Sequence, residues 1–188
     1  MSVGTAEATI DDLLAMPDDG IQRWLIRGDI REGGMTQRNR FHSKSEARVV
    51  QLIGNWLDTQ PEPRGEIHSG EAGVILSRNP DTSVGIDLVY VSHEIEAIDS
   101  DETTMIEGVP ILAVEISSPS TKEEETNDRI DELLEVGTAA VWVIDPYFQT
   151  ITVYRNHQPP RMYSGNDSIG NEDYLPGFRE AVVRFFKR

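Results

Sequence analysis

The chain has 188 residues, no cysteine and a formal net charge of −16. This length fits one domain, 1–188, with a sizeable hydrophobic core. The lack of cysteine excludes disulfides, thiolate zinc sites and cysteine nucleophiles, and the acidic charge disfavours tight nonspecific binding to nucleic acid.

Hydrophobic periodicity and turn residues divide the chain into alternating helices and strands. In the first half the expected elements are a helix at Thr9–Ala15, two strands around a Gly28 turn within Trp24–Ile30, a loop at Met35–Arg40, a long helix at His42–Asp58, and strands at Ala72–Ser77 and Val84–Val91. In the second half they are a loop at His93–Gly108, a strand at Ile111–Ile116, a helix at Ser120–Val136, strands at Ala139–Ile144 and Thr150–Tyr154, a loop at 156–177, and a closing strand or short helix at Phe178–Phe186. This order predicts an α/β domain with helices packed on a central sheet.

Two Ser-x-x-Glu patterns indicate where the long helices begin. Ser43 with Glu46, and Ser120 with Glu123, each fit a capping box. Gly137 is a natural C-terminal stop for the second helix. If Ser43 caps the first long helix, Glu46 has a structural role there; the alternative is a role in a functional site.

The charge is unevenly distributed, and no segment predicts a membrane association. Arg23–Arg48 and Arg179–Arg188 are basic, whereas Glu94–Glu107 is acidic. A local basic face is one interpretation, and an ordinary solvated surface is the other. The N-terminus lacks the features of a signal peptide, and no apolar run approaches the roughly 20 residues that span a bilayer. We therefore expect a cytoplasmic protein without a membrane partner.

Two carboxylates, Asp87 and Glu115, lie inside strongly apolar predicted strands. A charge buried in such a strand costs several kcal/mol unless it is compensated. If the two strands are neighbours, both carboxylates can reach one hard divalent cation such as magnesium, which prefers oxygen ligands. The alternative is that each carboxylate accepts hydrogen bonds or faces water.

The sequence around these carboxylates resembles the Uma2 family, formerly a domain of unknown function. The likeness rests on Asp87, on Glu115–Thr121, and on Gly137–Pro146 followed by Thr152–Tyr154. It extends to the opening, Met16–Gly20, and so covers nearly the whole chain. It implies the PD-(D/E)XK, restriction-endonuclease-like fold, an α/β fold with a mixed central β-sheet flanked by helices. It also implies an endonuclease, a phosphodiesterase acting on DNA with Mg²⁺ or Mn²⁺.

The resemblance implies a role for three acidic residues. Asp87 and Glu115 match the two carboxylates that bind the metal, although Ile86 stands where proline is usual. Glu46, on the first long helix, matches an extra acidic residue that such nucleases often carry there.

The resemblance also implies a catalytic lysine on the helix that follows Glu115, and Arg129 occupies that position. Arginine keeps the positive charge and can stabilise a phosphate, but it cannot act as a base. Lys122 lies on the same helix face and is a weaker substitute. A surface pairing of Arg129 with Glu125 or Asp131 is the structural alternative. Leu133 stands where the family usually has tyrosine.

Two functions therefore remain open. The retained carboxylates favour a nuclease. The missing lysine and tyrosine and the net charge favour a catalytically impaired member that binds a protein or nucleic acid. A basic patch beside Asp87 would favour DNA.

Nucleases of this fold often dimerise, so a homodimer is one assembly to test. Among the histidines, His42 precedes the first long helix and is expected to line a pocket.

Overall fold

The structure, a computed structural model, describes residues 7–34, 38–98, 104–118 and 123–187. Its helices are α1 (Ile10–Leu14), α2 (Arg40–Leu57), α3 (His93–Glu96), α4 (Glu123–Glu135) and the 3₁₀ helix η1 (Val182–Phe185). Its strands are β1 (Ile21–Ile26), β2 (Asp29–Gly34), β3 (Glu66–Ser77), β4 (Thr82–Val91), β5 (Ile106–Glu107), β6 (Leu112–Ile116), β7 (Ala140–Asp145), β8 (Thr150–Arg155), β9 (Gln158–Ser164), β10 (Ser168–Glu172) and β11 (Leu175–Ala181). None of the described helices is long and apolar enough to cross a membrane.

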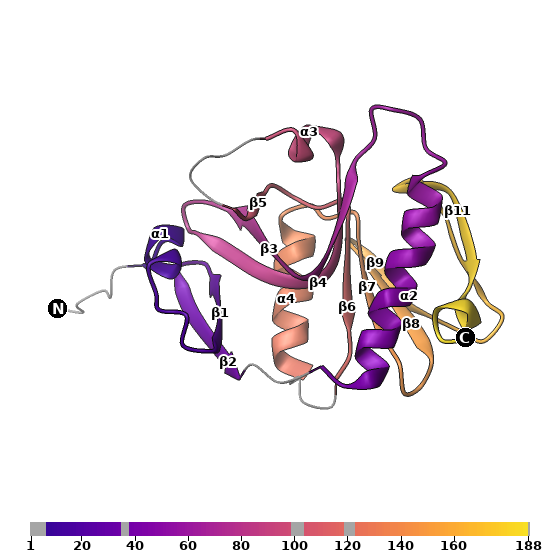
Figure 1. Cartoon of the computed structure of the whole chain (residues 1–188), viewed down its shortest axis with the longest axis horizontal. Coiled ribbons are helices and arrows are strands. Elements are labelled where there is room, and N and C mark those ends of the chain that lie inside the picture. Colours follow the sequence, from indigo (N-terminus) through magenta and orange to yellow (C-terminus); the bar gives the residue numbers. More distant parts are fainter. Residues whose placement is uncertain (1–6, 35–37, 99–103, 119–122, 188) are drawn as a thin grey trace.

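A mixed sheet runs through the molecule, with α2 on one face and α4 on the other (Figure 1). Among the described residues it has nine strands in the order β2-β1-β4-β6-β7-β8-β9, with β3 beside β4 and β5 beside β3. β6 and β7 are parallel because α4 connects them as a crossover. β4 and β6 are antiparallel neighbours. The predicted mixed central sheet flanked by helices is confirmed.

The core has two layers that meet on β6, whose five residues are all buried. Leu112, Val114 and Ile116 belong to the cluster under α2. Ala113 belongs to the cluster under α4. Leu133 of α4 is fully buried in that second cluster, so the residue that stands where the family has tyrosine is part of the core. Such coverage of both faces explains why the strand is an uninterrupted apolar run apart from Glu115.

α2 begins earlier than predicted because Asn39 caps it. The Asn39 side chain accepts hydrogen bonds from the backbone N–H groups of Phe41 and His42. Asparagine is among the preferred N-cap residues. Ser43 and Glu46 therefore lie inside the helix, and the capping box predicted for them is wrong. Glu46 is left available for the functional site.

Most other elements of the first half are confirmed, with shifted ends. α1 is capped by Thr9, which forms a capping box with Asp12, and β1 and β2 meet at a turn containing Gly28, whose φ is +77°. β3 is longer than predicted. Residues 35–37 of the predicted loop lie outside the described residues, as do Ser120 and Lys122, so the second capping box and the substitute role of Lys122 stay predictions.

The stretch predicted as a loop at His93–Gly108 contains α3 and β5. Ser92 caps α3 by accepting a hydrogen bond from the N–H of Ile95. Both Ile95 and Ile106 pack against the α4 side of the core. Residues 99–103 lie outside the described part of the chain. Because these contacts come from distant segments, the local sequence carries no periodic signal for either element.

The prediction of a loop at 156–177 is wrong, since this stretch forms β9, β10 and the start of β11. β9 is an edge strand, and its register with β8 shifts between Arg161 and Gln158, so Pro159 and Pro160, which lack N–H groups, lie where the ladder is interrupted. Gly170 lies at a bulge with a φ of +117°, where a Cβ atom would collide with the backbone of Phe178. In this stretch the prolines therefore mark an edge strand, and Gly170 marks a bulge, instead of a loop. The closing segment Phe178–Phe186 is both a strand and a short helix, as its two readings allowed.

Candidate active site

Asp87 and Glu115 come together where β4 and β6 stop pairing. The ladder between the two strands ends at Leu88 and Val114, one residue short of both carboxylates. Beyond that point the N–H of Ile116 donates to Asp87 Oδ2, at 2.8 Å, instead of continuing the ladder. Asp87 is 3% exposed and Glu115 is 6% exposed. The predicted neighbourhood of the two strands is confirmed, and both carboxylates are buried.

The two carboxylate oxygens of Asp87 have different surroundings: Oδ2 is hydrogen-bonded, and Oδ1 is not. Its Oδ2 also lies 3.2 Å from His42 Nε2. Within the described residues, its buried Oδ1 has no hydrogen-bond partner, and a guanidinium nitrogen of Arg38 lies 3.8 Å from it. A buried polar atom without a hydrogen bond costs about 1–3 kcal/mol, so Asp87 Oδ1 is a candidate ligand atom for a cation. His42, expected to line a pocket, instead contacts Asp87 from the interior.

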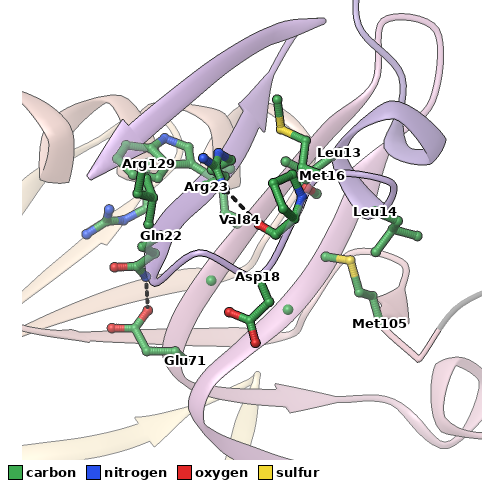
Figure 2. Close-up of a pocket in the computed structure, with 16 residues that line it drawn as sticks. Leu13, Leu14, Met16, Asp18, Gln22, Arg23, Glu71, Val84, Met105 and Arg129 are labelled. Carbon is green, nitrogen blue, oxygen red and sulfur yellow. Dashed lines mark hydrogen bonds between the residues drawn. The ribbon is translucent and has the colours of Figure 1, made fainter. Parts of the chain in front are cut away.

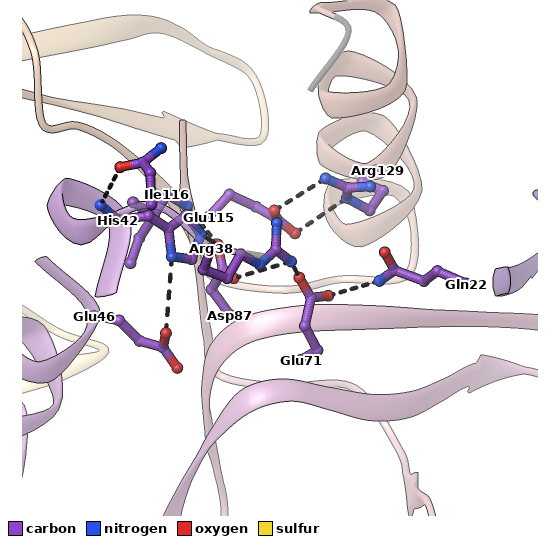
Figure 3. A network of polar contacts seen from close by, with 10 residues as sticks. Gln22, Arg38, His42, Glu46, Glu71, Asp87, Glu115, Ile116 and Arg129 are labelled. Atoms are coloured by element: carbon purple, nitrogen blue, oxygen red, sulfur yellow. Dashed lines mark hydrogen bonds and ion pairs between the residues drawn. The ribbon is translucent and has the colours of Figure 1, made fainter. Parts of the chain in front are cut away.

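Glu115 forms a two-pronged ion pair with Arg129 of α4 (Figure 3). Arg129 Nε and Nη2 donate to the two carboxylate oxygens, each at 3.1 Å. Burial nevertheless raises the pKa of Glu115 to about 7; Arg129 opposes this rise, and the charge of Asp87 adds to it. The structure therefore places Arg129 in the site, bonded to Glu115.

Glu46 reaches the site from α2, one helical turn after His42. Its Oε2 lies 3.8 Å from His42 Nδ1. Partial burial and the charge of Asp87 raise the pKa of Glu46, while His42, Arg38 and a backbone hydrogen bond from Gly70 oppose the rise. All four residues singled out from the sequence thus lie in one region of the protein.

The sequence analysis missed Glu71, an acidic residue of the same region. Gly70 and Glu71 form a bulge in β3 that lies opposite Asp87 of β4. Both residues have positive φ values, +86° and +60°. The bulge directs the Glu71 side chain toward Arg38, with which it pairs, and toward Gln22, whose amide donates to it at 3.0 Å. The signal in the sequence was Gly70, because glycine inside a strand often marks a bulge.

The site carries more negative than positive charge. The network drawn in Figure 3 contains the carboxylates of Glu46, Glu71, Asp87 and Glu115 and the guanidinium groups of Arg38 and Arg129. If all six of these groups are ionised, the four carboxylates exceed the two guanidinium groups by two negative charges. Burial raises the pKa of Glu115 and of Glu46, so without a cation a proton on either carboxyl group would reduce this excess.

The donor chemistry fits a hard divalent cation, and the arrangement fits it only in part. The donors are carboxylate oxygens, and one of them, Asp87 Oδ1, accepts no hydrogen bond among the described residues. However, in the part of the chain that the structure describes, no three Asp, Glu or His side chains are grouped closely enough to hold a metal ion. Both oxygens of Glu115 are already bonded to Arg129. A cation bound by Asp87 would have to share Glu115 with that arginine.

A cavity of about 370 Å³ adjoins the network (Figure 2). Gln22, Glu71 and Arg129 line it on the side of the carboxylates. Leu13 of α1 and Met105 contribute apolar surface on the other side. Neither Asp87 nor Glu115 is among its lining residues, so the cavity meets the network at Gln22, Glu71 and Arg129 and not at the two buried carboxylates.

The fold is shared with a crystal structure described as that of "a putative nuclease belonging to DUF820" from Anabaena variabilis ATCC 29413. The two chains are 21% identical and superpose with a TM-score of 0.76 over 95% of this chain and 97% of that chain. The protein thus shares the mixed α/β fold of that structure, built on a mixed sheet.

The family follows from the sequence comparison. The model of the Uma2 family, described as "Putative restriction endonuclease", matches residues 10–183. The chain belongs to the Uma2 family, as its motifs implied. A search among curated proteins gives no match.

Proposed function

We propose that this protein is a metal-dependent endonuclease that hydrolyses phosphodiester bonds in DNA, with Mg²⁺ or Mn²⁺ as cofactor. Asp87 and Glu115 hold the cation, and Glu46 assists them. The observation that carries the proposal is buried Asp87 beside Glu115, with an Oδ1 that accepts no hydrogen bond among the described residues and lies 3.8 Å from Arg38. The network around it has more carboxylates than guanidinium groups. Membership of the Uma2 family, whose description is "Putative restriction endonuclease", supports the same reaction.

The side chains around the carboxylates have distinct tasks in this proposal. A bound divalent cation supplies Lewis-acid polarisation of the phosphate and a water of lowered pKa. His42 and the N–H of Ile116 fix the orientation of Asp87 through Oδ2, so Oδ1 is the oxygen that remains for the cation. Arg129 provides a permanent positive charge for a phosphate oxygen but cannot accept a proton.

A second candidate is a non-catalytic member that uses the same region to bind a partner. The observation in its favour is the Glu115–Arg129 pair, which occupies both oxygens of a carboxylate that the nuclease needs. In this case the arginine replaces the cation electrostatically, and Glu115 is a structural residue.

Metal binding separates the two candidates. Isothermal titration of the wild type with Mg²⁺ and with Mn²⁺ should show saturable binding, and Asp87→Asn combined with Glu115→Gln should abolish it. Glu172→Gln is the matched control, because Glu172 also forms a two-pronged pair with an arginine, Arg155, away from the site. Cleavage of supercoiled plasmid in Mn²⁺ should follow the same pattern.

The absence of saturable binding in the wild type at millimolar metal would contradict the nuclease and favour the second candidate. Binding that survives in the double variant would place the cation elsewhere and contradict the assignment of Asp87 and Glu115.

A further inference from the structure

Three aromatic side chains gather in the open near the start of α2. Phe41 is 45% exposed, Tyr147 is 49% exposed and Phe148 is 80% exposed. The rings of Phe41 and Tyr147 lie 5.5 Å apart, and the guanidinium of Arg40 lies 5.2 Å from the Phe41 ring centre. Exposed aromatic residues that cluster, unlike single ones, indicate a binding surface. We call Phe41, Tyr147 and Phe148 the aromatic platform.

The platform lies beside the candidate active site. Tyr147 and Phe148 belong to the turn after β7, and β7 pairs in parallel with β6 up to Ile116, the residue after Glu115. Asp145 holds this turn by accepting hydrogen bonds from the N–H groups of Tyr147 and Phe148, at 2.8 and 2.9 Å. Phe41 is the neighbour of His42, which contacts Asp87. The platform therefore forms part of the rim around the buried carboxylates.

A row of cations leads away from the platform along α2. Arg40, Lys44 and Arg48 recur every four residues, so they lie on one helix face at intervals of about 6 Å. Lys44 Nζ donates to the carbonyl of Phe186 at 2.7 Å, and Arg48 Nε donates to the carbonyl of Lys187 at 3.1 Å.

Those contacts join the two basic segments of the sequence, and Figure 1 shows the C-terminal end beside α2. Because Lys44 and Arg48 are bound there by carbonyl groups and not by carboxylates, their charges are not neutralised by these partners. Helical spacing places this row on the side of α2 away from His42 and Glu46, so it does not border Asp87. A basic row on an acidic protein is nevertheless complementary to a polyanion.

We propose that the aromatic platform and the cationic row of α2 bind an unpaired stretch of DNA next to the active site. The inference rests on the proposed function, since it names the form of DNA that reaches the carboxylates. In a duplex the base faces are stacked on one another, whereas unpaired bases expose faces that can stack on Phe41, Tyr147 and Phe148. Arg40, Lys44 and Arg48 contact the phosphates of the same strand.

Binding without cleavage tests the inference. Fluorescence anisotropy in EDTA would compare labelled oligothymidine of about 15 nucleotides with a duplex of the same length. We expect the single strand to bind more tightly. Tyr147→Ala combined with Phe148→Ala should weaken its binding by about tenfold or more, and Met162→Ala, a change at an exposed apolar residue of β9, should leave it unchanged.

The cationic row has its own readout. Arg40→Glu places an acidic residue in the first turn of α2, which favours the helix, so a loss of binding would not reflect unfolding. It should weaken binding and reduce the slope of log affinity against log salt concentration by about one or more. Arg161→Glu, on the exposed edge strand β9, is the control for net charge.

Equal or tighter binding of the duplex would overturn the inference, as would platform variants that bind the single strand like the wild type. A dimer in analytical ultracentrifugation that Phe148→Ala converts to a monomer, with DNA binding unchanged, would assign the platform to a second copy of the chain and overturn it too. Failure of the proposed function is distinguishable, because single-strand binding that depends on the platform can be observed in a protein that neither binds metal nor cleaves plasmid.

Discussion

Two glutamate–arginine pairs in this protein have similar geometry and different surroundings. Glu115 and Arg129 form two hydrogen bonds of 3.1 Å, and Glu172 and Arg155 form two of 2.8 and 2.9 Å. The second pair is partly exposed and packs beside Tyr174. The first is more deeply buried and shares its region with three other carboxylates.

The difference shows that an arginine partner alone does not make a carboxylate structural. At Glu115, burial and the charge of Asp87 outweigh Arg129 and raise the pKa of the carboxyl to about 7. The pair is therefore one part of an incomplete charge balance, whereas Glu172 and Arg155 are two charges that balance each other at the surface. A functional ligand is expected at the first pair, and changes at the two pairs should have unequal effects.

The largest contrast is expected in DNA cleavage. Glu115→Gln or Asp87→Asn should lower the rate of plasmid cleavage in Mn²⁺ by about a hundredfold or more, since the cation contributes several kcal/mol to the stabilisation of the transition state. Glu172→Gln should stay within about twofold of the wild type. Equal losses at the two pairs would mean that both act through stability.

The next contrast concerns the free energy of unfolding as a function of pH. With its pKa raised to about 7, Glu115 keeps a proton in the folded protein at pH values where the unfolded chain has lost it, above the ordinary value of 4.5. Because the folded state then binds more protons, this group lowers stability as pH rises from about 4.5 to 7, by on the order of 1–3 kcal/mol. Above about pH 7 its contribution is constant.

Urea unfolding at a series of pH values would measure that slope in the absence of divalent metal. The decrease between pH 4.5 and 7 should be reduced in Glu115→Gln and retained in Glu172→Gln. An identical pH profile of stability for the wild type and Glu115→Gln would contradict the raised pKa of the Glu115 carboxyl group.

Arg129→Lys should change the affinity for metal, and we expect an effect of intermediate size. Lysine carries a single charged nitrogen and cannot bond both carboxylate oxygens in the planar two-pronged manner of arginine. One oxygen of Glu115 would become available, so we expect Mn²⁺ affinity to rise by about tenfold, roughly 1.4 kcal/mol. The measurement is calorimetric titration, with Arg155→Lys as the control; weaker metal binding in Arg129→Lys would contradict the idea that the arginine competes with the cation.

The smallest effect is expected at the surface pair. Glu172→Gln should cost at most about 1 kcal/mol in the free energy of unfolding, because partly exposed ion pairs are screened by water and salt. Chemical denaturation in low and high salt would test this. A loss several times larger would mean that this pair is as tightly coupled to its surroundings as Glu115.

Only part of the site could be predicted from the sequence. Asp87 and Glu115 stood out because a carboxylate within an apolar run is costly at any fold. Glu71 did not, since its place in the site depends on a two-residue bulge opposite Asp87. Arg38 likewise reaches Asp87 and Glu71 only through the folding of segments far apart in the chain.

The fold shows the same division. Strands covered on both faces and amphipathic helices have strong local periodicity, and they were predicted. The strands within 156–177 were missed because an edge strand and a bulge use the proline and glycine that also mark loops. Asn39 was missed as the cap of α2 because it lies within a polar stretch.

The sequence by itself determined the apolar strands and the long helices. It also identified Asp87 and Glu115, because a carboxylate within an apolar strand needs compensation. Only the tertiary structure decided that Glu115 pairs with Arg129 and that the bulge at Gly70 brings Glu71 into the site. It also decided that Lys44 and Arg48 of α2 meet the C-terminal residues. The physical reason is range: periodicity and burial cost act within a few residues, whereas charge balance and surface complementarity arise between segments that folding brings together.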